Sequence, residues 1–319
     1  MPLKQVIEAL ELLENPHVNG CEVGKHIEER GLSTWDVVPL EGENGATDAI
    51  TIHFAGTHGR KSGGNAPTLG IVGQLGGIGA RPEVLGLVSD ADGAVTAIAC
   101  AFKLADLLTA GEQLAGDVII STHICPNAPT IPHDPVPFMG SPVGLDAMHR
   151  VMIQKEMEAI LSIDTTRGNR VVNRRGFAIT PTVKEGYILK VSDKLLTIMS
   201  VVSGRAPVVL PLSTQDITPY GNGIDHINSI MQPATATDAP VVGVALTAES
   251  VVPGCASGAN QPLDIEMTAR FCLETAKAFG KDKDLFFDRD EFDQLLGLYG
   301  SMRHLQTTGK QKPQADGKG

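Results

Sequence analysis

Residues 87–108 read LVSDADGAVTAIACAFKLADLL and join the end of an apolar segment, two acidic residues and a long apolar run. The pattern predicts a strand over 84–88 that leads into Asp90 and Asp92, followed by a helix of about four turns. Small residues after Asp92, beginning with Gly93, would let the helix start lie close against a sheet. Two interpretations of the acids are open. They cap the helix, or they belong to a site at the edge of an α/β sheet.

Apolar strands and helices alternate along the rest of the chain, which is typical of a three-layer α/β protein. The residues are 42% hydrophobic but only 4% aromatic. The core must therefore be built from aliphatic side chains, as in parallel sheets covered on both faces. We expect a mixed, mostly parallel sheet flanked by helices. The expected strands are 48–54, 68–72, 84–88, 117–121, 159–164, 208–212 and 241–246, with a hairpin over 177–191, and the expected helices are 3–14, 22–30, 93–108, 145–158, 192–202, 223–231, 264–279 and 290–299.

The same pattern divides the chain into three parts. Residues 1–47 are expected to be a helical N-terminal lead-in, and residues 48–300 a single α/β domain. Residues 301–319 are polar and rich in Gly and Lys, so we expect a disordered tail.

Composition also limits the partners. The net charge of −11 argues against nucleic acid, because phosphate contacts need clustered Lys and Arg. The basic cluster of Arg167, Arg170, Arg174 and Arg175 is interpreted either as a solvated loop or as an anion site. Five cysteines without a CxxC pair argue against a disulfide scaffold or a thiolate zinc site. With no apparent signal peptide or membrane-spanning run, we expect a cytoplasmic protein with no membrane partner.

The run of Gly73, Gly76, Gly77 and Gly79 does not match a dinucleotide site. That fingerprint requires GxGxxG at the start of a helix, whereas Pro82 follows this run closely. A tight turn between strands is the better interpretation.

Four residues with metal-binding side chains fall at or near the ends of expected strands: His53, Asp90, His123 and Asp164. The carboxyl ends of parallel strands meet at one edge of a sheet, so these side chains are expected to lie together. Histidine and carboxylate groups are ligands of catalytic divalent metals, which keep one position open for water. The pattern therefore predicts a metal site at this edge.

The order of these features resembles the co-catalytic zinc aminopeptidase clan, which includes the tetrahedral and glutamyl aminopeptidases. The segments that carry the resemblance span roughly residues 48–280. They are the strand-end His53, the helix start 90–95 (DADGAV), the strand end 162–166 (SIDTT) and the Gly-rich start 221–225 (GNGID). The chain also resembles a bacterial family catalogued as a domain of unknown function.

The resemblance implies a zinc-exopeptidase-like fold in which His53, Asp90 and Asp164 hold one metal and Asp90 is the bridging carboxylate. The chain departs from the clan in three places. His53 lacks the His-x-Asp partner, Thr122-His123 replaces a Glu-Glu pair, and the loop 251–258 carries Cys255 near the place of the final His. The ligands specific to a second metal are therefore absent from the expected positions, and His123 becomes a fourth ligand or the general base.

Two functions follow as expectations. The first is a metal-dependent hydrolase of a small peptide or amide, with one zinc, manganese or cobalt ion. The second is a peptidase-like protein without activity that binds a small amino-acid-like ligand or a protein partner. A Cys-dependent enzyme that uses Cys125 or Cys255 is a further alternative. We also expect a homo-oligomer, and we assign no role to Asp225, His226 or Glu249.

Overall fold

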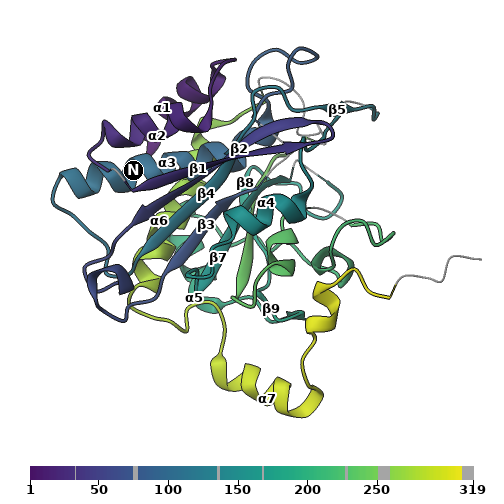
Figure 1. Cartoon of the computed structure of the whole chain (residues 1–319). Helices are drawn as coiled ribbons and strands as arrows, with labels where there is room; N and C mark the ends of the chain where they lie inside the picture. The colour runs from purple at the N-terminus through teal and green to yellow at the C-terminus, as the bar shows by residue number, and fades with distance from the viewer. Residues whose placement is uncertain are drawn as a thin grey trace, which may run out of the picture.

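The computed structural model describes residues 1–32, 34–74, 78–134, 137–166, 169–226, 229–250 and 259–310. Within these ranges the chain forms a mixed α/β structure with helices on both faces of a central sheet (Figure 1). The helices are α1 (Leu3–Glu14), α2 (Gly20–Glu28), α3 (Asp92–Thr109), α4 (Leu145–Met152), α5 (Asp193–Ser203), α6 (Pro262–Phe279) and α7 (Arg289–Tyr299). None of the helices in the described ranges is long and apolar enough to cross a membrane.

The described sheet has nine strands in the order β1-β2-β4-β3-β7-β11-β9-β10, and β8 also pairs with β11. Strands β4, β3, β7 and β11 run parallel, whereas β2, β8 and β9 run antiparallel to their neighbours. The strands of this sheet are β1 (Trp35–Gly42), β2 (Gly45–Phe54), β3 (Leu69–Gly73), β4 (Val118–Ile124), β7 (Ala159–Thr166), β8 (Gly176–Ile179), β9 (Val183–Lys184), β10 (Tyr187–Ile188) and β11 (Val241–Thr247), and a separate small ribbon pairs β5 (Thr130–Ile131) with β6 (Phe138–Met139). The expected mixed sheet flanked by helices is confirmed, but the expectation that it is mostly parallel is wrong: only β4, β3, β7 and β11 pair in parallel, and the other described pairings in this sheet are antiparallel.

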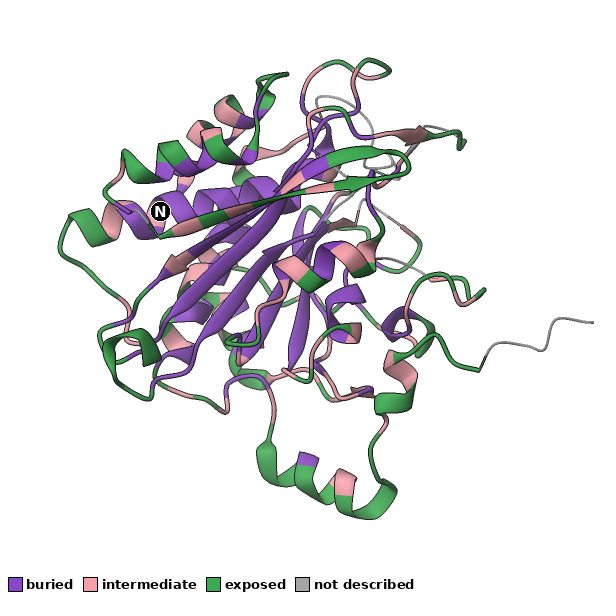
Figure 2. Cartoon of the chain, in the orientation of Figure 1, coloured by how far each residue is buried: buried purple, intermediate pink, exposed green. Residues whose placement is uncertain are grey.

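Two apolar clusters cover the two faces of the sheet. One contains side chains from α1, α2, α3, α5 and α6. The other contains Met148 and Met152 of α4 and apolar residues from the irregular segment before β11. Figure 2 shows the buried strands between these layers and the mostly exposed helix α7 below them.

Helix α3 is the central element of the first layer. Every residue from 92 to 102 is buried, and the helix contacts β3, β4 and β7 as well as α1 and α6. The long apolar run predicted this helix, and the small residues at its start explain its close approach to the sheet. At Gly93 an added Cβ would lie 2.7 Å from the carbonyl oxygen of Ile163 and 2.8 Å from that of Gln74.

The Gly93→Ala variant is therefore expected to lose about 1–3 kcal/mol of unfolding free energy, because backbone atoms must move to admit the methyl group. Urea unfolding measures this loss. Gly297→Ala is the matched control, since nothing lies within 4 Å of that position in α7. It should instead gain up to about 1 kcal/mol from helix propensity. Equal effects of the two changes would contradict the close packing described for α3.

Several local predictions are wrong. Residues 84–88 form no strand: Gly86 has a φ of 80°, Leu85 is exposed, and only isolated bridge residues occur at 87 and 88, with Leu87 paired to Gly79. Residues 208–212 likewise contribute a single bridge, between Val209 and Ile179. Glycines with positive φ at 221 and 223 prevent a helix from starting there, and residues 227–228 lie outside the described ranges.

The two ends of the chain also differ from expectation. The lead-in contains α1 and α2 but also β1, which pairs with β2 at the edge of the sheet. At the other end, the short helix η5 (Arg303–Gln306) falls within the segment expected to be disordered.

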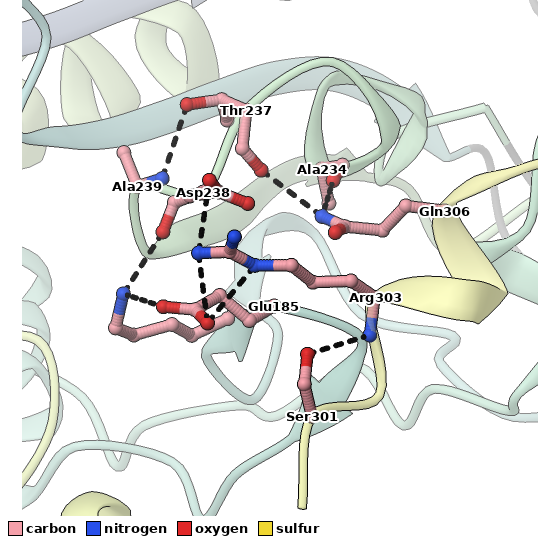
Figure 3. Close-up of polar contacts among 9 residues, drawn as sticks. Glu185, Ala234, Thr237, Asp238, Ala239, Ser301, Arg303 and Gln306 are labelled. Carbon is pink, nitrogen blue, oxygen red and sulfur yellow. Dashed lines mark hydrogen bonds and ion pairs between the residues drawn. The ribbon is translucent and has the colours of Figure 1, made fainter.

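Side chains of η5 attach it to the body of the protein (Figure 3). Arg303 forms ion pairs with Glu185 and Asp238. Gln306 Nε2 donates to the carbonyl oxygens of Ala234 at 2.6 Å and Thr237 at 3.0 Å. The order in this segment therefore comes from contacts with distant residues, which its polar composition does not indicate.

Candidate functional site at the carboxyl edge of the sheet

The four predicted metal ligands are not brought together. Strand β2 is antiparallel to β4 and pairs His53 with Ile119, near the start of β4, whereas His123 lies near its end. His53 is therefore at the opposite edge of the sheet from His123 and Asp164. There its Nε2 faces Asp36 at 4.0 Å, and burial lowers its pKa. The placement of His53 beside the other three residues was wrong because it assumed a parallel strand.

A different residue takes the position between His123 and Asp164. The registers pair Val72 of β3 with Ser121 of β4 and with Ser162 of β7. Two residues further on, Gln74 is level with His123 and Asp164, and its backbone N–H donates to the carbonyl oxygen of Ile163 at 2.7 Å. Since side chains alternate along strands, these three residues point toward the face covered by α4.

Asp164 is buried at the centre of this edge. Its Oδ1 accepts a hydrogen bond from the backbone N–H of Thr165 at 2.7 Å, and its Oδ2 accepts one from Ser229 Oγ at 2.5 Å. Burial, and secondarily the nearby Asp90 carboxylate, raise the pKa of Asp164 to about 7. Asp164 and Asp90 are thus neighbours, and the raised pKa leaves the Asp164 carboxyl group partly protonated near neutral pH.

A short helix, and not the strand expected over residues 84–88, positions Asp90 at the carboxyl edge of the sheet. Asp90 lies in this helix, η2 (Ser89–Ala91), which contacts the end of β7 through a hydrogen bond from Thr165 Oγ1 to the carbonyl oxygen of Ser89. The N-cap of α3 is Ala91, and no side chain caps this helix. Asp92 is buried at the first position of α3, where its Oδ1 accepts from Asn260 Nδ2 at 2.6 Å. Asp92 therefore anchors the segment before α6.

His123 and His149 form a buried pair beside Gln74. His123 Nδ1 lies 2.9 Å from Thr47 Oγ1, and His149 Nε2 lies 3.0 Å from Gln74 Oε1. Burial lowers the pKa of each imidazole to about 4, and the neighbouring His149 is a secondary cause of the lowered pKa of His123. Both rings are therefore neutral at pH 7, which makes His123 a weak base.

Three buried polar atoms along this face have no hydrogen-bond partner. They are Gln74 Nε2, Thr166 Oγ1 and Thr247 Oγ1, from the ends of the neighbouring strands β3, β7 and β11. Thr166 and Thr247 are directly paired, and both lie on the same face as Asp164. Because unpaired buried donors are unfavourable, this edge has a capacity for hydrogen bonding that the described residues do not use.

The remaining candidate residues lie at varying distances from this edge. Tyr220 is near enough to Asp164 for the carboxyl group to help raise its phenolic pKa, although burial is the larger cause. The Tyr220 ring packs edge-on against His226, whose Nε2 lies 2.9 Å from the carbonyl oxygen of Thr218. Burial raises the pKa of the Cys125 thiol, which disfavours the reactive thiolate. Cys255 and Arg167 lie outside the described residues.

These residues do not fit the co-catalytic metal pair implied by the zinc aminopeptidase resemblance. Within the described ranges, no group of three or more His, Cys, Asp or Glu side chains could hold a metal ion. The carboxyl groups of Asp90 and Asp164 are neighbours, but the side chain beside them on the next strand is the amide of Gln74. The sequence places Gln74 two residues after the expected strand 68–72, but glutamine is a poor metal ligand and the glycines around it indicated only a turn.

The comparisons with known proteins identify the family. No curated protein matches the chain. The model of the family described as "Protein of unknown function (DUF1177)" matches residues 39–309, which include the whole parallel core and every residue of the carboxyl-edge site. The chain therefore belongs to the DUF1177 family.

Proposed function

We propose that the chain binds a small amino-acid-like or short-peptide ligand at the carboxyl edge of β3, β7 and β11. The observation that carries the proposal is the set of three unpaired buried atoms, Gln74 Nε2, Thr166 Oγ1 and Thr247 Oγ1, beside two neighbouring carboxyl groups. Open α/β sheets commonly bind ligands at this edge.

The chemistry of the site favours a ligand with both a cationic and a neutral polar group. Asp90 and Asp164 supply carboxylates for an amine. Gln74 follows β3, the strand next to that of Asp164, and its Nε2 is a donor for a carbonyl or carboxylate oxygen. The similarity of the segments around Asp90 and Asp164 to the zinc aminopeptidase clan also supports a peptide-like ligand.

A second candidate function is a hydrolase that holds a single zinc, manganese or cobalt ion. The observation in its favour is the proximity of Asp90 and Asp164, because a cation would replace the proton that burial, and secondarily the nearby Asp90 carboxylate, retain on Asp164. A metal-bound water would supply the nucleophile. Against this candidate, His123 is already engaged by Thr47 and is a weak base.

Calorimetric titration with the dipeptide leucyl-glycine and with leucinamide tests the proposal. The Gln74→Leu variant is expected to bind roughly tenfold more weakly, the loss that corresponds to one hydrogen bond of about 1.4 kcal/mol. Gln5→Leu is a matched control, because Gln5 is also a buried glutamine with one unpaired amide atom, but it lies on α1 and bonds to Asp106. If neither probe binds, or if both variants weaken binding equally, the proposal is wrong.

A further inference from the structure

A groove of about 410 Å³ lies where β8 begins, on the face of the sheet covered by α5 and α6. Arg174 and Arg175 enter it from the segment before β8, and Arg205 enters from the segment after α5. Phe177, Met199 and Met267 supply an apolar wall. Gly176 pairs with Thr247 at the end of β11. The groove therefore lies at the same edge of the sheet as the carboxyl-edge site around Asp164, but on the opposite face.

Neighbouring groups hold two of the three arginines in place, but fewer carboxylates than guanidinium groups lie at this groove. Arg175 Nε donates to Asp264 Oδ2 at 3.1 Å, and Arg205 Nη1 donates to the carbonyl oxygen of Arg175 at 3.4 Å. Arg174 makes no hydrogen bond or ion pair with any residue in the described ranges. Glu249 is the one acidic residue among the described residues that line the groove. In a chain of net charge −11, this is a local concentration of positive charge.

We propose that this groove binds a small carboxylate with an apolar body. Guanidinium groups bind carboxylate oxygens through paired, charge-assisted hydrogen bonds. Arg174 and Arg205 are available for such a pair, while Asp264 fixes Arg175 beside them. The apolar wall offers contact area to a hydrocarbon group but nothing to a bare oxyanion. The proposal does not depend on ligand binding at the carboxyl-edge site.

Titration with 4-methylpentanoate, its neutral amide and inorganic phosphate tests the charge and the apolar body separately. The carboxylate is expected to bind at least tenfold more tightly than either other probe. Arg174→Ala and Arg205→Ala should each weaken carboxylate binding about tenfold, in keeping with the loss of a charged hydrogen bond. Arg170→Ala is the matched control, because Arg170 is exposed in the same segment but does not line the groove.

Equal affinities for 4-methylpentanoate and its neutral amide would contradict the proposal that the arginines bind the carboxylate group. Equal affinity for phosphate would contradict the proposal that the ligand needs an apolar group. The same conclusion would follow if acetate bound as tightly as 4-methylpentanoate. No binding in the millimolar range, or equal losses in Arg170→Ala and Arg174→Ala, would overturn the site itself. Unchanged melting temperatures of the variants establish that any loss is not due to unfolding.

Discussion

Asp164→Asn is expected to stabilise the chain relative to the wild type by an amount that grows by about 4 kcal/mol between pH 4 and pH 8. The pKa of Asp164 is raised from 3.8 to about 7 in the folded protein. Between these values the folded state keeps a proton that the unfolded state has released. The stability of the wild type therefore falls as the pH rises toward 7, whereas asparagine does not titrate.

Urea unfolding of both proteins at intervals from pH 4 to pH 8 measures the difference. Asparagine retains an oxygen that can accept from the Thr165 N–H, and Ser229 can accept from its amide, so the local hydrogen bonds are largely preserved. A difference that does not change with pH would contradict the raised pKa of the buried Asp164 carboxyl group.

The second large effect has the opposite sign. The wild type is expected to lose stability relative to His149→Gln as the pH falls from 6.5 to 4, by about 1.4 kcal/mol per pH unit and about 3 kcal/mol in all. The pKa of His149 is lowered from 6.5 to about 4. In this interval the unfolded imidazole binds a proton that the folded one does not, so stability is present above pH 6.5 and is lost on acidification.

Urea unfolding of the wild type and of His149→Gln over the same range, pH 4 to pH 8, measures this difference. Glutamine at position 149 can still hydrogen bond to Gln74 but does not titrate. The double variant with His123→Asn should lose still more of the pH dependence, because the pKa of His123 is also lowered to about 4. If His149→Gln shows the same slope as the wild type, the ring is not buried in its neutral form.

Local sequence signals were sufficient for much of the fold. The periodic apolar run predicted α1 at its observed bounds, and Ser192 caps α5 through a hydrogen bond from the Leu195 N–H. The buried strands β4, β7 and β11 were identified because each is a short, continuous aliphatic segment. His123 and Asp164 were placed at one edge because both end parallel strands.

Strand direction and pairing were not available from these signals. The sequence of an apolar strand such as β2 does not indicate whether the strand runs parallel or antiparallel to its neighbours. Only the antiparallel pairing of β2 with β4 shows that His53 lies at the opposite edge of the sheet from His123. Gln74 was missed for a related reason, since only the register of β3 against β7 makes it a neighbour of Asp164. Asp90 was associated with Asp164, although η2 rather than a strand brings it there.

In the proposed function, protein side chains at the carboxyl edge, and not a metal ion, hold the ligand. The most direct test is to repeat the leucyl-glycine titration after exhaustive treatment with a chelator and again with added zinc, manganese or cobalt. We predict a dissociation constant that stays within about twofold in all conditions. Loss of binding in the chelated protein, with recovery on addition of one of these metals, would contradict the claim and favour the single-metal hydrolase.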